Sequence, residues 1–423
     1  MKKFNIKHAI IGELVVVLVL SSFLIYQHVR EGSIDTFYPN SEKNYIKWVD
    51  FDICSAALGK AYEYDVASQT EEIKLNWIEL LSYLGTRYGG DFSRYKEKDL
   101  NALVQKLKNK EETMGSITEG LKYYDYYLEA YTAVLGGFVG EYEIQVNSEE
   151  NPEEKVWVKK YGLKAFLPVA KFFPYSDYDD FGVSRSYGYK RKHLGHDMMG
   201  QVGTPIVAVE SGWVEALGWN QYGGWRIGIR SFDGKRYYYY AHLRKNFPYN
   251  KALEVGSVVQ AGDVIGYLGR TGYSRNENVN NIDTPHLHFG MQLIFDESQK
   301  EGYNEIWIDC YDIINFLYRN RSETVKNTET KEWSRVFDMK DPSVQDYLNN
   351  KDKYPDPTQK RNLDDDPGDE NVNPDAKGIE HNSNGNDTDN KNTDNNTDNN
   401  NTDNNTDSKT NSDDNTEKQN NEN

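Results

Sequence analysis

Apolar residues between positions 41 and 145 recur every three or four residues, which is the spacing of one helix face. One stripe runs from Ile73 to Leu84 and is followed by Gly89-Gly90, a typical helix end. Two further stripes run over 100–107 and 121–135. We therefore predict a helical domain over 41–145, with the stripes as core faces. Its role is open, and it could hold a protein partner.

The period changes near Val156, and short alternating strands with glycine-rich turns continue to about residue 300. Asp233-Gly234 is a strong hairpin signal between two of these strands. We predict an all-β antiparallel domain over 156–300. The expected strands include Pro205–Val209, Trp213–Leu217, Trp225–Arg230, Arg236–Leu243 and Val264–Leu268.

Two segments follow the predicted β-domain. Residues 304–350 return to a helical pattern, with Ile306, Cys310, Ile313 and Leu317 on one side, and predict a C-terminal helical extension. Residues 355–423 lose their apolar side chains and contain repeats of Asn-Thr-Asp, so we expect a disordered tail. The tail could be a solvated brush or a passive extension.

The N-terminus carries an apolar run of 18 residues from Ala9 to Tyr26, just enough to span a membrane. Lys2, Lys3 and Lys7 precede it and place that end in the cytoplasm. No small-x-small cleavage site follows the run, although a cleaved signal peptide is the alternative. We predict a cytoplasmic stub and single-pass anchor over 1–30 in the cell membrane, with the rest of the chain outside. The fold class is then α+β overall.

Charge and cysteine content exclude several classes of protein. The net charge of the 423 residues is −18, and the segment from Asp364 to Asn423 holds 17 acidic and four basic residues. A nucleic-acid-binding protein would need a basic face, so we expect that this chain does not bind nucleic acid. Cys54 and Cys310 are too few for a disulfide framework or a four-cysteine zinc site. We expect both to be unpaired buried thiols.

Five of the eight histidines fall in the predicted β-domain. His286 and His288 are two apart in a strand pattern, so they share a face. A second motif, His193-Leu194-Gly195-His196-Asp197, offers further nitrogen and oxygen donors. Two histidines and an aspartate suit Zn²⁺ and leave its fourth position open for chemistry.

These motifs resemble the M23 metallopeptidases, the lysostaphin and LytM type of zinc endopeptidase that cuts peptidoglycan cross-links. The resemblance covers about 172–295. It is carried by Phe181-Gly182-Val183-Ser184-Arg185, the His193–Asp197 motif, Gly203–Ala208, Tyr240-Ala241-His242-Leu243, Val255–Gly266 and His286-Leu287-His288-Phe289.

The resemblance implies a peptidoglycan hydrolase with one Zn²⁺ per chain and a peptidoglycan peptide as substrate. It makes His193, Asp197 and His288 the zinc ligands. His242 and His286 become catalytic, one as general base and one as stabiliser, in an order that the sequence leaves open. His196 is extra, and we expect it near the ligands or on the surface, with ligation as the alternative.

Two features temper a simple catalytic interpretation. The loop Tyr273–Pro285 is longer than the common form and could shape the cleft or restrict access to it. Some members of the family resemble silent scaffolds in sporulation or division complexes, which is the alternative function. Such scaffolds often lose a ligand, whereas all five site positions are filled here, which favours an active enzyme.

Overall fold

A computed structural model describes residues 45–186, 190–302 and 304–354 of the chain. The predicted anchor over 1–30 and the predicted tail over 355–423 lie outside the described residues. Within those described residues, no helix has both the length and the apolar character needed to cross a membrane.

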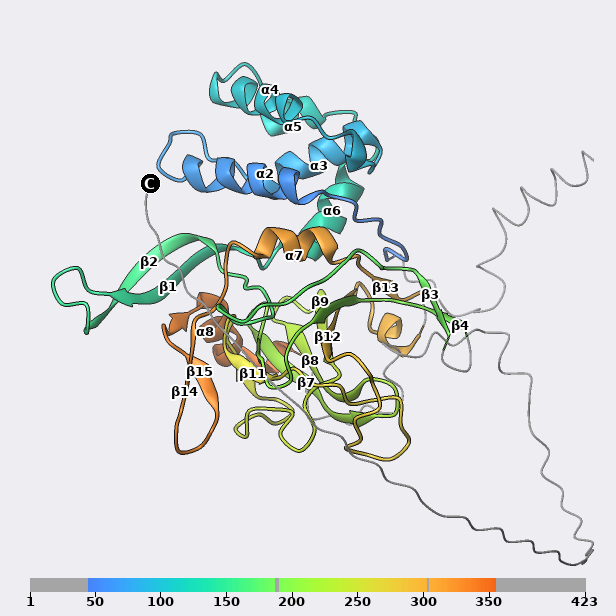
Figure 1. The fold of residues 1–423 in the computed structure, drawn as a ribbon. Coiled ribbons are helices and arrows are strands. Elements are labelled where there is room, and N and C mark those ends of the chain that lie inside the picture. Colours follow the sequence, from blue (N-terminus) through green and yellow to red (C-terminus); the bar gives the residue numbers. More distant parts are fainter. Residues whose placement is uncertain (1–44, 187–189, 303, 355–423) are drawn as a thin grey trace, which may run out of the picture. The chain divides into compact units, whose positions relative to one another are not determined.

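The predicted N-terminal helices are confirmed, and α3 shows why they form where they do. The Asn76 side chain accepts hydrogen bonds from the backbone N–H groups of Ile78 and Glu79 and so caps the first turn. Gly89 ends the helix in the left-handed region, at φ 68°. The helices are α2 (Ser55–Ser68), α3 (Trp77–Tyr88), α4 (Glu97–Lys108), α5 (Met114–Thr118) and α6 (Tyr124–Leu135) (Figure 1).

The end of the predicted helical domain is wrong. Residues after Phe138 form a long hairpin of β1 (Val139–Asn147) and β2 (Lys155–Leu163), and β16 (Met339–Lys340) pairs with β1. Polar and apolar residues alternate over Glu141–Val146, a period-two pattern that favours a strand. The all-β part of the chain therefore begins about 17 residues earlier than predicted, at Val139 rather than Val156.

The central sheet is antiparallel, as predicted, and its strands follow the order β10, β7, β8, β9, β12, β13. A further strand, β5, pairs with the same edge of β12 as β13 does, nearer the start of β12. The bounds are β5 (His196–Met199), β7 (Gly212–Asn220), β8 (Gly224–Ser231), β9 (Arg236–Ala241), β10 (Val258–Val259), β12 (His286–Leu293) and β13 (Ile306–Trp307). Small two-stranded sheets join β3 (Ser184–Ser186) to β4 (Lys190–Lys192), β6 (Pro205–Val207) to β11 (Val264–Tyr267), and β14 (Thr324–Lys326) to β15 (Trp333–Arg335).

The predicted C-terminal helical extension is also wrong. Within 304–350, helix covers only α7 (Tyr311–Leu317) and α8 (Pro342–Asn349), and the four short strands β13 to β16 lie in the remainder. Ile306 and Trp307 pair with Leu293 and Gln292 on β12 instead of continuing a helix. The 4-3-4 spacing that includes Ile306 and Cys310 is therefore coincidental. Cys310 and Cys54 are both free thiols, as predicted, although Cys54 is half-buried rather than buried.

The helices and the central sheet share one hydrophobic core, which includes buried residues of α2, α3, α6, α7, β8, β9 and β12. Arg236 at the start of β9 ties the two regions together. Its buried guanidinium pairs with Glu210 at 2.8 Å and donates to the Ala133 carbonyl of α6 at 2.6 Å. Glu210 also lies close to the backbone just after α6, since a Cβ added to Gly137 would lie 1.6 Å from Glu210 Oε1.

Candidate metal centre

The register of β12 brings together three motifs that are far apart in the sequence. His288 lies directly opposite Asp197 of β5 on one side and Ala241 of β9 on the other. Residues directly opposite each other in antiparallel strands point to the same face. His288 and Asp197 therefore share a face, and His286 shares it because it is two residues away.

His193, Asp197 and His288 are all buried and form a compact triangle of donor atoms. His193 Nε2 lies 3.1 Å from both Asp197 Oδ1 and His288 Nδ1, and the last two atoms are 2.9 Å apart. A tetrahedral zinc ion about 2.0–2.1 Å from each donor would hold them roughly 3.3–3.4 Å apart. The donor set and its spacing therefore fit Zn²⁺ after an outward shift of a few tenths of an ångström.

Gly195 makes this triangle possible. A Cβ at that position would lie 2.5 Å from the Cε1 and Nε2 atoms of His288 and 2.9 Å from the Phe289 carbonyl oxygen. Any side chain here would push His288 and its strand β12 away from His193 and Asp197. The glycine of the His-Leu-Gly-His-Asp motif thus serves close approach rather than a turn.

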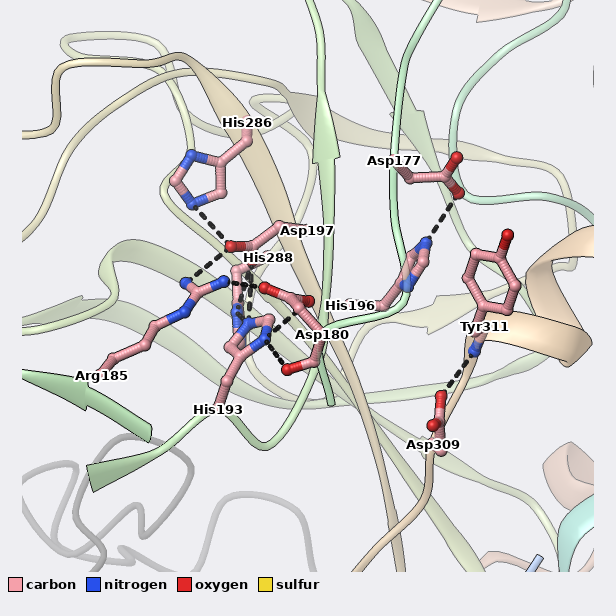
Figure 2. A network of polar contacts seen from close by, with 10 residues as sticks. All are labelled: Asp177, Asp180, Arg185, His193, His196, Asp197, His286, His288, Asp309 and Tyr311. Carbon is pink, nitrogen blue, oxygen red and sulfur yellow. Dashed lines mark hydrogen bonds and ion pairs between the residues drawn. The ribbon is translucent and has the colours of Figure 1, made fainter. Parts of the chain in front are cut away.

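Asp180 and Arg185 surround the triangle and orient two of its members (Figure 2). His193 Nδ1 lies 3.0 Å from Asp180 Oδ1, which fixes the ring with Nε2 toward the other donors. Arg185 donates to Asp197 Oδ2 at 2.7 Å and also to Asp180. Neither residue was assigned a role from the sequence. Arg185 belongs to the quoted Phe-Gly-Val-Ser-Arg motif, so that motif was the available signal.

The hydrogen bonds of the triangle shift the pKa values of His193 and Asp197 in opposite directions. Burial opposes the charge of His193, but bonds to Asp180 and Asp197 raise its pKa to about 9. Burial likewise opposes ionisation of Asp197, yet hydrogen bonds from His193 and His288 hold its pKa well below the usual range. The metal-free site therefore holds a protonated His193 beside an ionised Asp197 at neutral pH.

His242 and His286 lie beside the triangle, and main-chain carbonyls fix their tautomers. His242 Nδ1–H donates to the Thr271 carbonyl at 2.9 Å, and His286 Nδ1–H donates to the Thr284 carbonyl at 2.8 Å. Both rings therefore keep the Nε2 lone pair available. His286 Nε2 lies 3.8 Å from Asp197 Oδ2, and the centres of the two histidine rings are 4.8 Å apart.

His242 follows β9 and adopts φ 60°, a left-handed conformation that is unusual for a residue with a side chain. Burial, and then the nearby His286 and His288, lower its pKa well below 6.5. The ring is therefore neutral at pH 7. A neutral imidazole that carries its proton on Nδ1 can accept another proton at Nε2.

His196 does not join the site, and its predicted position is wrong. It alternates with Asp197 along β5, so it points to the opposite face, where it is buried rather than on the surface. Its Nε2 lies 2.8 Å from Asp177 Oδ2, and its ring is 5.8 Å from that of Tyr311 in α7 (Figure 2). It therefore supports the packing of α7 behind the sheet.

Residues 191–301 match the family model described as Peptidase family M23. An L-Ala–D-Glu endopeptidase of Bacillus subtilis is 39% identical over 131 residues, which are 31% of this chain and 38% of that protein. Lysostaphin of Staphylococcus staphylolyticus is 42% identical over 98 residues, or 23% of this chain and 18% of that protein. The solved catalytic domain of Staphylococcus simulans lysostaphin is 31% identical, covers 33% of this chain and 92% of that structure, and has a TM-score of 0.26. The chain thus spans well under half the length of these two curated relatives.

Proposed function

Because residues 191–301 form a domain of peptidase family M23, we propose that this chain is a zinc-dependent endopeptidase that hydrolyses peptide bonds of bacterial peptidoglycan. The observation that carries the proposal is the buried triangle of His193, Asp197 and His288 with His242 and His286 beside it. The Bacillus subtilis relative is named as an endopeptidase, which supports the same reaction class. Its name gives a bond to D-Glu, a residue type of wall peptides.

His193, Asp197 and His288 would hold the ion through one nitrogen, one carboxylate oxygen and one further nitrogen. Zinc supplies Lewis acidity, which polarises a carbonyl and lowers the pKa of water toward neutrality. Asp180 keeps His193 in the tautomer that exposes Nε2, and Arg185 holds Asp197 through the oxygen that faces away from His193. These contacts prepare the donors before any substrate arrives.

His242 and His286 would transfer the protons of peptide hydrolysis. One Nε2 would accept a proton from the attacking water. The other ring, carrying protons on both nitrogens, would donate its Nε2–H to the carbonyl oxygen as negative charge develops on it. Both rings have their Nδ1–H anchored on a carbonyl, so either is able to take either role. The lowered pKa of His242 favours it as the base, because it stays neutral at neutral pH.

Turnover of purified peptidoglycan tests the proposal. The purified protein, loaded with zinc, should release peptide fragments with new amino groups from peptidoglycan. A chelator that removes the zinc should stop this release. Zinc binding at one ion per chain without release from any wall preparation or cross-link peptide would favour the scaffold alternative.

We also propose that the apolar run Ala9–Tyr26 anchors the protein in the cell membrane with its peptidase region outside. The motive is the flank of Lys2, Lys3 and Lys7 and the missing cleavage site. Protease added to wall-stripped cells should remove the peptidase region. Mature protein in the medium that begins after residue 30 would contradict this proposal.

A further inference from the structure

A second arginine lies on the same side of the β3–β4 hairpin as Arg185. Arg191 of β4 is directly opposite Arg185 of β3, so both side chains leave the same face. Arg185 reaches the ligand Asp197 from that face. Arg191 therefore lies on the metal side of the hairpin, two residues before His193.

Two tyrosine rings lie beside Arg191, and one of them also contacts His242. Its guanidinium carbon lies 5.1 Å from the ring centre of Tyr273 and 5.9 Å from that of Tyr222. The Tyr273 ring stacks on His242, with centres 5.9 Å apart and planes inclined by 30°. These three residues, Arg191, Tyr222 and Tyr273, form what we call the aromatic wall.

The aromatic wall is fixed by the backbone rather than by its side chains alone. The Tyr273 N–H donates to the Tyr222 carbonyl at 3.1 Å, and Ser274 N–H donates to the Gln221 carbonyl at 2.8 Å. These bonds tie the start of the long loop over 273–285 to the turn between β7 and β8. Tyr273 itself is held at φ 48°, in the left-handed region.

The chemistry of the aromatic wall suits a carboxylate beside a carbon chain. Tyrosine rings pack on the face of a guanidinium, whereas carboxylates are bound by its edge in a bidentate manner. Arg185 is already engaged by Asp180 and Asp197, two carboxylates of the protein itself. With zinc bound, the charges of the ion and of Arg185 together exceed those of the two aspartates, so the site attracts an anion.

We propose that Arg191, held by Tyr222 and Tyr273, binds a carboxylate on the residue beside the cleaved bond. The substrate class is then an acidic stem peptide, such as one with a free D-Glu carboxyl group, rather than an uncharged glycine bridge. This inference rests on the proposed function and specifies its substrate.

The test compares a stem peptide containing L-Ala–γ-D-Glu with the same peptide whose D-Glu carboxyl group is a carboxamide. Wild-type protein should cleave the acid with a kcat/KM roughly 10–100-fold above that of the amide, the range of a lost charge-assisted hydrogen bond. Arg191→Gln should bring the two peptides within about threefold by slowing only the acid, and Arg191→Lys should restore part of the difference. Lys192→Gln makes the same charge change on the adjacent, exposed residue of β4 and should keep the wild-type ratio.

A binding measurement separates this inference from the proposed function. Calorimetry with zinc-loaded His286→Ala protein should show tighter binding of the acid than of the amide, and a double variant with Arg191→Gln should lose that difference. Equal cleavage and equal binding of both peptides by protein with Arg191 intact would overturn the inference while peptidase activity stands. Binding that discriminates without turnover in the wild type would instead refute the function and keep the role of Arg191.

Discussion

Asp180 Oδ1 lies 3.0 Å from His193 Nδ1, on the side of the imidazole that faces away from Asp197 and His288. Together with the Asp180 main-chain carbonyl oxygen, which lies 3.3 Å from the same nitrogen, this contact decides which nitrogen of His193 is offered to a metal. It also places a second carboxylate behind the ligand, which strengthens the ring as a donor. The metal triangle therefore depends on a residue that would not touch the ion.

Replacing Asp180 with alanine should lower zinc affinity by about 10–100-fold, because His193 loses the carboxylate behind its ring and keeps only the 3.3 Å contact with the main-chain carbonyl of residue 180. Competition with a chelator of known affinity measures the change. Asp177→Ala is the matched control, since Asp177 contacts His196 on the far face of β5. Equal zinc affinity of the wild type and the Asp180 variant would show that Asp180 has no orienting role.

His288→Ala should remove zinc and activity together, because it breaks a three-donor site. His286→Ala should keep zinc and lose about 10²–10⁴-fold in rate, since its Nε2 only faces Asp197 from 3.8 Å and would serve proton transfer. His193→Ala and Asp197→Ala should behave like the first variant, and His242→Ala like the second. Zinc content by mass spectrometry and peptide cleavage, measured for each variant, distinguish the two kinds of residue. A His286 variant without zinc and a His288 variant with it would reverse the assignment.

Zinc binding should release a proton from the metal-free protein at pH 7–8. The folded pKa of His193 is about 9, above the ordinary value near 6.5, so this pairing stabilises the metal-free fold fully below about pH 6.5. The stabilisation fades as pH rises through about 9. Because a ligand must be deprotonated, apparent zinc affinity should rise roughly tenfold per pH unit over this window. Calorimetry in two buffers of different ionisation enthalpy counts the proton, and binding without any proton release would contradict the prediction.

Arg236→Met should destabilise the fold by about 3–5 kcal/mol, because it leaves the Glu210 carboxylate buried without its cation. Urea unfolding followed by circular dichroism measures this loss. Glu72→Ala is the control, because it breaks an exposed pair with Lys110 and should cost less than about 1 kcal/mol. A similar small change for both variants would mean that the Arg236 network contributes little to stability.

The sequence predicted the strands around the site well because their periodicity is local. Strict alternation over Trp225–Arg230 and the Asp233-Gly234 turn needed no knowledge of distant residues. The prediction from local periodicity failed for Ile306. This residue has helical spacing by chance, but it pairs with β12 and lies in a strand. Long-range pairing is also why Asp180, adjacent to no recognised ligand in sequence, escaped notice.

For the candidate site, too, the sequence identified some residues and missed others. The resemblance to a family supplied His193, Asp197 and His288, and the structure brings these three together. It does not identify the carbonyls of Thr271 and Thr284, which fix the two tautomers, since any residue has a carbonyl. His196 was misplaced because the motif alone does not show that the strand β5 begins there, and a strand sends neighbouring residues to opposite faces.

Arg236 has a consequence for how the family-matched domain of this chain is inherited. The strand that leads into His242 begins with a guanidinium anchored on the carbonyls of α6, about 100 residues earlier in the chain. A recombination event that moved only the family-matched segment, 191–301, into another gene would leave that anchor and the shared core behind. We therefore expect the helices and the strands around the metal site of this chain to be inherited together, as one unit.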